Sequence, residues 1–345
     1  MTDAESAVGP TPWTACFTDQ KMTVRAYGRR SADDDWGLGA TVDLSPPCPT
    51  PVLLVPPLMV KPFIFDLTEQ RSMVRHLQRA GFDVYLLDFG EPDDRDREVT
   101  LSDYVLRWMP AAVEAAKAHS GASEVFIAGY CMGGLFALMH CAASKAEDVK
   151  GVVTIGSPFD SHKMGVLSVL ARLFDREVGF VSDRLGNVPG ALSSSMFKLM
   201  HPLKQVTRYA DLFMNLYDEQ YVQSFDALSA WTNGFIDYPQ RAFQQVFQQF
   251  MVGNEFKGDG LALESVEGGA VVRVKLSDVR QPVLAFAGES DDVVRPAAVK
   301  ELPSLVSSED VEVMVAPGGH MGVFAGRGAP EAVWTPAAAW MRARG

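Results

Sequence analysis

The sequence has little of what metal sites, disulfide frameworks and membrane spans require. Its 345 residues include four cysteines, and no CxxC pair or Cys/His cluster has zinc-site spacing. We therefore expect no metal site and reduced thiols. The longest apolar stretch, 51–60, contains three prolines and is too short for a transmembrane helix. The N-terminus lacks the basic and apolar regions of a signal peptide, so a cytoplasmic protein is expected.

Basic residues are also in short supply. The chain has 31 Lys and Arg against 43 Asp and Glu, which gives a formal net charge of −12. A field of that sign repels nucleic acids and anionic membrane surfaces. We therefore expect no nucleic-acid partner, and an anionic substrate would need a local basic patch.

Apolar residues are abundant, at 47% of the chain, and they occur in short runs that alternate with helical patterns. The runs that fit buried strands lie at 51–55, 82–89, 124–129, 150–157, 281–290 and 311–319. The helical patterns lie at 67–80, 101–119, 131–144 and 331–342. This alternation predicts an α/β fold over residues 1–345, with a mostly parallel central sheet flanked by helices.

The alternation stops between residues 160 and 250, where helical patterns, aromatic residues and methionines prevail. A helical insertion between two strands of a sheet is typical of a cap over an active site. A packed subdomain and a dimer interface are the alternatives. We interpret 160–250 as a cap inserted within the single α/β domain.

One glycine-rich turn predicts the chemistry. Residues 129–134 read Gly-Tyr-Cys-Met-Gly-Gly and connect a buried strand to a buried helix. This is the G-x-S-x-G nucleophile elbow of the α/β-hydrolase fold, with Cys131 in the place of serine. The helix N-terminus favours a thiolate at this position. An inert, buried cysteine, as expected for Cys141, is the alternative.

The order of the remaining candidates favours the catalytic interpretation, because this fold requires nucleophile, then acid, then histidine. The strand at 281–290 is followed by Asp291, which has the usual Gly-x-x-Asp spacing, whereas Glu289 and Asp292 are interpreted as solvated turn acids. His320 follows the last strand in a glycine-rich loop. The other histidines are expected to serve packing or to lie on the surface: His76, His119, His140, His162 and His201.

These residues predict a Cys131–His320–Asp291 triad. His320 would take the proton of Cys131, and Asp291 would fix the imidazole tautomer. The backbone N–H groups of Met132 and Leu58 are the predicted oxyanion donors. Leu58 is chosen because the two prolines before it have no N–H. A thiolate suits exchange with a thioester, which favours an acyltransferase over a plain esterase.

The chain resembles the polyhydroxyalkanoate synthases, in particular the short catalytic subunit of the two-component type. The similar stretches are 56–105, 129–134, 156–160, 288–294 and 317–322, with weaker similarity around Phe197, Pro202 and Trp231. The chain departs from the family at Asp292, where histidine is usual, and at Val60-Lys61, where Asn-Lys is typical.

The resemblance implies an enzyme that polymerises (R)-3-hydroxyacyl-coenzyme A into polyester on granules, with the acyl chain on Cys131 and support from His320 and Asp291. Coenzyme A then enters as part of the substrate, and no cofactor is implied. A second synthase subunit is implied as a partner, and the apolar cap is compatible with a homodimer. Two alternatives stay open: a cysteine-dependent thioesterase or intracellular polyester hydrolase with the same triad, and a non-catalytic granule scaffold.

Overall fold

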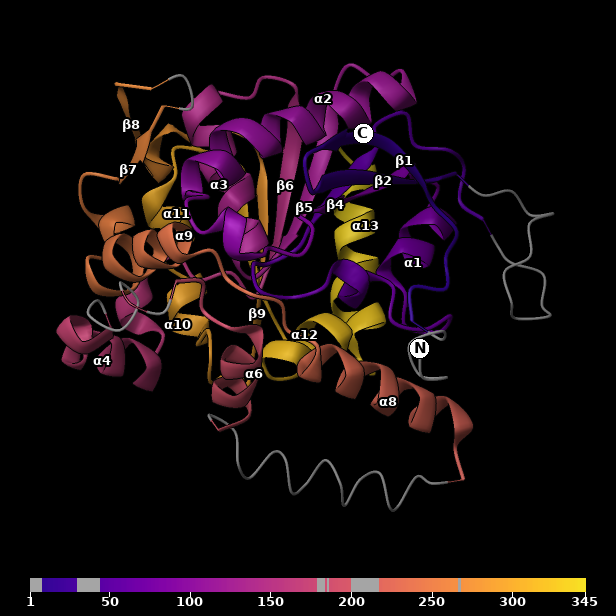
Figure 1. Ribbon diagram of the computed structural model, residues 1–345. Coiled ribbons are helices and arrows are strands. Elements are labelled where there is room, and N and C mark those ends of the chain that lie inside the picture. Colours follow the sequence, from indigo (N-terminus) through magenta and orange to yellow (C-terminus); the bar gives the residue numbers. More distant parts are fainter. Residues whose placement is uncertain (1–7, 30–43, 179–183, 185, 200–216, 266–267) are drawn as a thin grey trace.

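The computed structural model describes residues 8–29, 44–178, 184, 186–199, 217–265 and 268–345 (Figure 1). An eight-stranded sheet in the order β1-β2-β4-β3-β5-β6-β9-β10 runs through the centre of the described chain. Its strands are β1 Thr14–Asp19, β2 Met22–Gly28, β3 Val52–Val55, β4 Val84–Asp88, β5 Val125–Tyr130, β6 Val149–Ile155, β9 Val283–Gly288 and β10 Val311–Ala316. Within this sheet, β4, β3, β5, β6, β9 and β10 pair in parallel with their neighbours. At the other edge, β1 pairs antiparallel with β2, and β2 pairs antiparallel with β4. The predicted α/β-hydrolase architecture is therefore confirmed.

Helices cover both faces of this sheet. Successive strand residues point to opposite faces, so Leu53 and Val55 join one buried cluster while Val52 and Leu54 join the other. The first cluster lies under α2 Met109–Ser120 and α3 Met132–Ser144. The second lies under α1 Met73–Arg79 and α13 Thr335–Arg342. Because β3 is buried on both sides, it reads as a continuous apolar run rather than an alternating one.

A set of helices is inserted between β6 and β9. Figure 1 shows α4, α6 and α8 together at the lower side of the molecule, with α12 next to α8. The inserted elements are α4 Val166–Leu173, α6 Gly190–Leu199, α8 Glu219–Asn233, α9 Gln240–Gln245 and the hairpin of β7 Leu261–Glu264 and β8 Val271–Val274. The positions Pro202 and His201 lie outside the described residues.

Short helices complete the chain. They include α10 Pro296–Val299, α11 Leu302–Leu305 and α12 His320–Ala325. Tight 3-10 turns lie at η1 Pro62–Phe65, η2 Asp94–Asp96, η4 Ser161–Lys163, η6 Glu255–Lys257 and η7 Leu276–Asp278, and π-helical turns at η3 Asp103–Trp108, η5 Val246–Val252 and η8 Pro330–Trp334. None of the helices within the described ranges is both long and apolar enough to cross a membrane.

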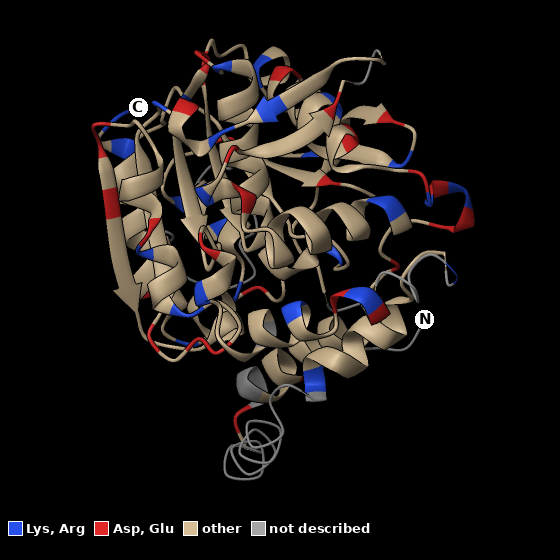
Figure 2. Ribbon diagram, turned by 90° about the vertical axis from the view of Figure 1, so that its left-hand side faces the viewer, with Lys and Arg blue, Asp and Glu red and all other residues tan. Residues whose placement is uncertain are grey.

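The structure differs from the sequence-based boundaries in a few places. The helix predicted from residue 67 begins at Met73, because the Ser72 hydroxyl caps it by accepting the backbone N–H of Arg75 at 3.0 Å. The last strand ends at Ala316 rather than at residue 319. The hairpins β1–β2 and β7–β8 were not predicted. Figure 2 shows basic and acidic residues interspersed along the outer elements of the ribbon.

Candidate active site

Cys131 lies in a strained turn between β5 and α3. Its φ of 51° and ψ of −118° fall in a region that non-glycine residues rarely adopt. The backbone holds this conformation in place: the Cys131 N–H donates to the Ile155 carbonyl at 2.8 Å, and its own carbonyl accepts the Gly134 N–H at 3.1 Å. Cys131 is half-buried.

The glycines around Cys131 are required by the close approach of backbone to backbone. A Cβ on Gly133 would overlap the carbonyl of Val55, and a Cβ on Gly129 would overlap the backbone of Gly133. The turn can therefore form only with glycine at both positions. Val55 is paired with Gly129 in the sheet, so the loop after β3 starts level with the elbow.

Asp291 and His320 lie together beside this turn. The imidazole Nδ1 of His320 is 2.8 Å from Oδ2 of Asp291. The other oxygen, Oδ1, accepts the backbone N–H groups of Val293 and Val294 at 2.9 and 2.8 Å. Both side chains are buried. A carboxylate held at three points can fix the orientation and the tautomer of the imidazole.

His320 also interacts with the Cys131 side chain, which contributes to its pKa. Since Asp291 occupies Nδ1, the nitrogen that faces the thiol is Nε2. Burial alone would lower the pKa of His320, but the charge on Cys131 and the hydrogen bonds to Asp291 and Cys131 outweigh burial and raise that pKa to about 10. The arrangement thus favours the imidazolium form of His320.

Two further residues fit around the imidazole. The Tyr130 hydroxyl donates to the His320 carbonyl at 3.1 Å, and the two rings lie 5.3 Å apart. Gly156 has a φ of +60°, and a Cβ there would lie 3.4 Å from the imidazole. His320 is the first residue of α12 and does not lie in an open loop, which corrects the expectation for its surroundings. Tyr130 and Gly156 were not predicted as site residues, although they lie within the quoted stretches 129–134 and 156–160.

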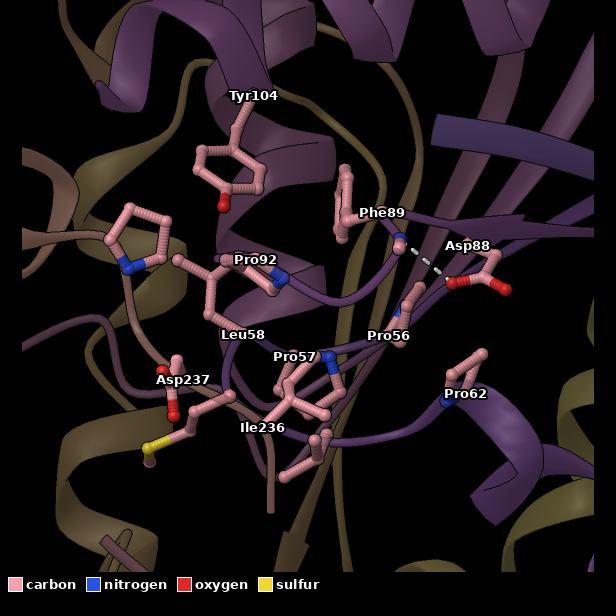
Figure 3. Close-up of a pocket in the computed structure, with 14 residues that line it drawn as sticks. Pro56, Pro57, Leu58, Pro62, Asp88, Phe89, Pro92, Tyr104, Ile236 and Asp237 are labelled. Carbon is pink, nitrogen blue, oxygen red and sulfur yellow. Dashed lines mark hydrogen bonds between the residues drawn. The ribbon is translucent and has the colours of Figure 1, made fainter. Parts of the chain in front are cut away.

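The predicted oxyanion donors come from two different elements. Met132 is the first residue of α3, where backbone N–H groups have no intrahelical partner. Leu58 is buried in the loop after β3 and lines a narrow cavity with Pro57 and Phe89. Figure 3 shows the hydroxyl of Tyr104 turned toward Leu58 and Pro92 in this cavity. Its volume is about 10 Å³, which is room for one water-sized group.

The inserted helices are attached to this loop by hydrogen bonds. The indole N–H of Trp231 donates to the Lys61 carbonyl at 2.9 Å. The backbone N–H of Ile236 donates to the Met59 carbonyl at 3.0 Å. The segment between α8 and α9 therefore lies directly on the loop that holds Leu58.

The other histidines of the described chain lie outside this cluster. His140 is buried, and burial lowers its pKa to about 4. The remaining three have partners elsewhere: His76 with Thr335, His119 with Tyr85 and His162 with the Val252 carbonyl. Of the predicted residues, the structure brings Cys131, His320 and Asp291 together, and their catalytic roles stay a prediction.

Comparison with known proteins agrees with this geometry. Residues 61–326 match the family model described as alpha/beta hydrolase fold. The chain is 31% identical over 339 residues to the poly(3-hydroxyalkanoate) polymerase subunit PhaC of Haloarcula marismortui, with 98% of this chain and 69% of that protein covered. It is 31% identical to the same subunit of Haloferax mediterranei, of which it spans 66%, slightly less than two thirds. The subunit of Allochromatium vinosum is 29% identical, with 97% of this chain and 90% of that protein covered.

Solved structures support the fold alone. A soluble variant of monoglyceride lipase from Saccharomyces cerevisiae has a TM-score of 0.56 at 14% identity, covering 99% of this chain and 96% of that one. The monoacylglycerol lipase of Paleococcus ferrophilus has a TM-score of 0.53 at 16% identity, covering 88% and 97%. Given the sequence relatives and this architecture, the chain belongs to the poly(3-hydroxyalkanoate) synthase family, within the α/β-hydrolase fold.

Proposed function

We propose that this protein is an acyltransferase that polymerises (R)-3-hydroxyacyl-coenzyme A into polyhydroxyalkanoate through an acyl thioester on Cys131. The observation that carries the proposal is the position of His320, whose Nδ1 is 2.8 Å from Oδ2 of Asp291 and whose imidazole interacts with the Cys131 side chain. Membership of the synthase family supports the substrate class.

In the first step the Cys131 thiolate attacks the thioester carbonyl of the substrate. The negative charge that develops on the carbonyl oxygen is stabilised by the backbone N–H groups of Met132 and Leu58. When the tetrahedral intermediate collapses, the carbon–sulfur bond to coenzyme A breaks and His320 gives its proton to the departing thiolate. The products are free coenzyme A and an acyl group on Cys131.

In the second step His320, now neutral, takes the proton of an acceptor hydroxyl. That hydroxyl oxygen attacks the acyl-Cys131 carbonyl, an ester bond forms, and the thiolate is released while His320 is again protonated. Asp291 holds Nδ1–H throughout and stabilises the imidazolium in both steps. Coenzyme A enters this scheme only as the leaving group of the substrate.

The acceptor must be a polymer hydroxyl rather than water, and the inserted helices supply the means. We propose that 160–250 forms a cap within a single domain over residues 1–345. The attachment of Trp231 and Ile236 to the loop of Leu58 supports this role, as does the apolar lining of the narrow cavity there. A site closed in this way limits the access of water to the acyl-enzyme.

The proposal also includes partners and a location. The family implies a second synthase subunit and association with polyester granules. Helix α4 exposes Val166, Leu173 and the adjacent Phe174, and an apolar surface of this kind supports contact with another subunit, with a second copy of the chain or with a polymer surface.

The test is incubation of the purified protein with 3-hydroxybutyryl-coenzyme A, with free thiol, the mass of the intact protein and the acyl product all followed. We expect thiol release, an acyl adduct on Cys131 and polyester, all absent in Cys131→Ala. Release of hydroxy acid without polyester would assign a thioesterase instead.

Iodoacetamide supplies the control for the nucleophile. Cys131 should react far faster than Cys16 and Cys141, because burial raises the pKa of both of those thiols. Equal rates at all three cysteines would contradict every catalytic role for Cys131 and favour a scaffold.

A further inference from the structure

Tyr130 immediately precedes the nucleophile in the chain, and it contacts the helix that carries His320 at two places. Its hydroxyl donates to the His320 carbonyl at 3.1 Å. Its ring stacks on the ring of Phe324, with the centroids 4.3 Å apart and an interplanar angle of 17°. Since His320 and Phe324 are four residues apart in α12, they lie on one face of that helix. The side chain of Tyr130 therefore contacts α12 over a full turn.

The other end of Tyr130 is fixed by the nucleophile turn. Tyr130 is the last residue of β5, and the next N–H along the chain, that of Cys131, donates to the Ile155 carbonyl at 2.8 Å. The residue after Ile155 is Gly156, where a Cβ would lie 3.4 Å from the imidazole and 3.7 Å from the Tyr130 ring. The imidazole, the phenol ring and the backbone that holds Cys131 therefore meet at one place.

The contacts between Tyr130 and α12 lie in the core. Tyr130 is 1% exposed, and the ring of Phe65 packs on the ring of Phe324 at 4.8 Å. The indole N–H of Trp334 also holds this helix, since it donates to the Phe324 carbonyl at 2.9 Å. A hydrogen bond in such a dry environment is costly to break, because the polar atoms that remain have no water to replace it. We therefore expect the position of α12 to depend on the Tyr130 hydroxyl.

We propose that Tyr130 is a positioning residue, whose ring and hydroxyl fix α12 so that the His320 imidazole keeps its place between Asp291 and Cys131. This inference rests on the proposed function, in which His320 gives and takes protons beside Cys131. Asp291 accepts from the imidazole at 2.8 Å. That contact sets the direction of the ring, but it does not fix the backbone that carries the ring. Tyr130 supplies the missing constraint, because it contacts that backbone directly.

The consequence is that the residue next to the nucleophile sets the distance between nucleophile and base. A displacement of about 1 Å among reacting groups can slow a reaction by about a hundredfold. Removal of the hydroxyl alone leaves the stacked ring in place, so a smaller displacement and a loss of about tenfold are expected. A residue that served stability alone would change the unfolding transition and leave the chemistry of His320 as it was.

The experiment compares two tyrosine variants, Tyr130→Phe and the matched control Tyr85→Phe. Tyr85 is as deeply buried as Tyr130, and its hydroxyl is 2.9 Å from the His119 ring, outside the site. Each variant loses one hydrogen bond of a buried tyrosine, so both should lower the midpoint of urea denaturation to a similar extent. Acylation of Cys131 by 3-hydroxybutyryl-coenzyme A, followed in a single turnover by intact-protein mass spectrometry, should slow about tenfold in Tyr130→Phe and stay unchanged in Tyr85→Phe.

NMR of ¹⁵N-labelled histidine supplies a readout that needs no substrate. The pKa of His320 is about 10 in the intact protein and should fall by about one unit in Tyr130→Phe. The reason is that the contacts with Asp291 and Cys131, which raise this pKa against burial, depend on the place of the ring. Phe324→Leu removes the stacked ring but keeps the hydroxyl contact, and it should lower the pKa of His320 as well. Tyr85→Phe should leave it unchanged.

The outcomes separate this inference from the proposed function. An unchanged pKa of His320 in both Tyr130→Phe and Phe324→Leu would overturn the positioning role and leave the proposed function standing. Equal losses of acylation in Tyr130→Phe and Tyr85→Phe would also overturn it, because Tyr130 would then act through stability alone. Absence of acylation in the wild type, with the shift in the pKa of His320 present, would overturn the proposed function and, with it, the catalytic meaning of the contact.

Discussion

The carboxyl edge of the sheet and the helices inserted above it are built in opposite ways. At the edge, Cys131 is held by two backbone hydrogen bonds and Asp291 by three contacts. In the inserted region, α4 leaves Val166 64% and Leu173 68% exposed. The first region is held at each residue by short backbone contacts, whereas the second leaves apolar side chains of α4 exposed and is joined to the loops of the sheet through its later segments, as in the backbone hydrogen bonds of Ile236 to Met59 and of Ala242 to Val99.

Under the proposed function, the difference follows from what each region would do. A nucleophile, base and acid must be held to within a fraction of an ångström for proton transfer and attack. A region that admits a substrate and then excludes water has to move, so it needs few contacts that resist opening. We therefore expect substitutions at the tightly held Cys131 turn and in the inserted helices to have different consequences.

The largest effect is expected for Gly133→Ala, which adds a methyl group at the rigid edge. The new Cβ would overlap the carbonyl of Val55, a backbone atom that cannot turn away. We expect a loss of about 3 kcal/mol or more in the free energy of unfolding, measured by urea denaturation. The matched control is Gly322→Ala in α12, where a Cβ meets nothing. Similar stabilities for both variants would show that the elbow is not sterically fixed.

A smaller effect is expected at the imidazole when its partner thiol is removed. Cys131→Ala takes away a charge and a hydrogen bond that raise the pKa of His320 against the effect of burial. That pKa, about 10 in the intact protein, should fall by one unit or more, about 1.4 kcal/mol per unit. NMR of ¹⁵N-labelled histidine measures it, with His140 as the reference whose pKa stays near 4.

The same pKa sets a dependence of stability on pH. The folded pKa of His320 lies above its unfolded value of about 6.5, so protonation stabilises the fold. That contribution is fully present below pH 6.5 or so and is lost as the pH rises through about 10. A wild-type stability curve that falls no more steeply over this window than that of Cys131→Ala would contradict the charge pairing.

The residues that the structure brings together at the candidate site follow from local pattern in the sequence. The elbow at 129–134 combines a strand, a helix and glycines within a few residues, and the fold's fixed order then identified Asp291 and His320. The contact between the inserted helices and the loop of Leu58 could not be predicted, because Trp231 and Ile236 lie far from that loop in the sequence. The alternation of buried side chains along β2 is a pattern typical of a strand. Its partner β1 is largely exposed, so its sequence lacks this pattern.

The smallest effect concerns the attachment of the inserted region. Trp231→Phe removes the indole N–H that donates to the Lys61 carbonyl at 2.9 Å and should cost about 1 kcal/mol. If the inserted helices are loosely attached, this loss should appear as faster amide exchange in α8 and in the loop 56–61, with exchange in β5 and β6 unchanged. Phe235→Leu, which alters the ring packed against Trp231 at 5.3 Å but keeps the hydrogen bond, is the control. Equal acceleration in β5 would mean that the two regions unfold as one unit, and that the cap opens only when the nucleophile turn itself is lost.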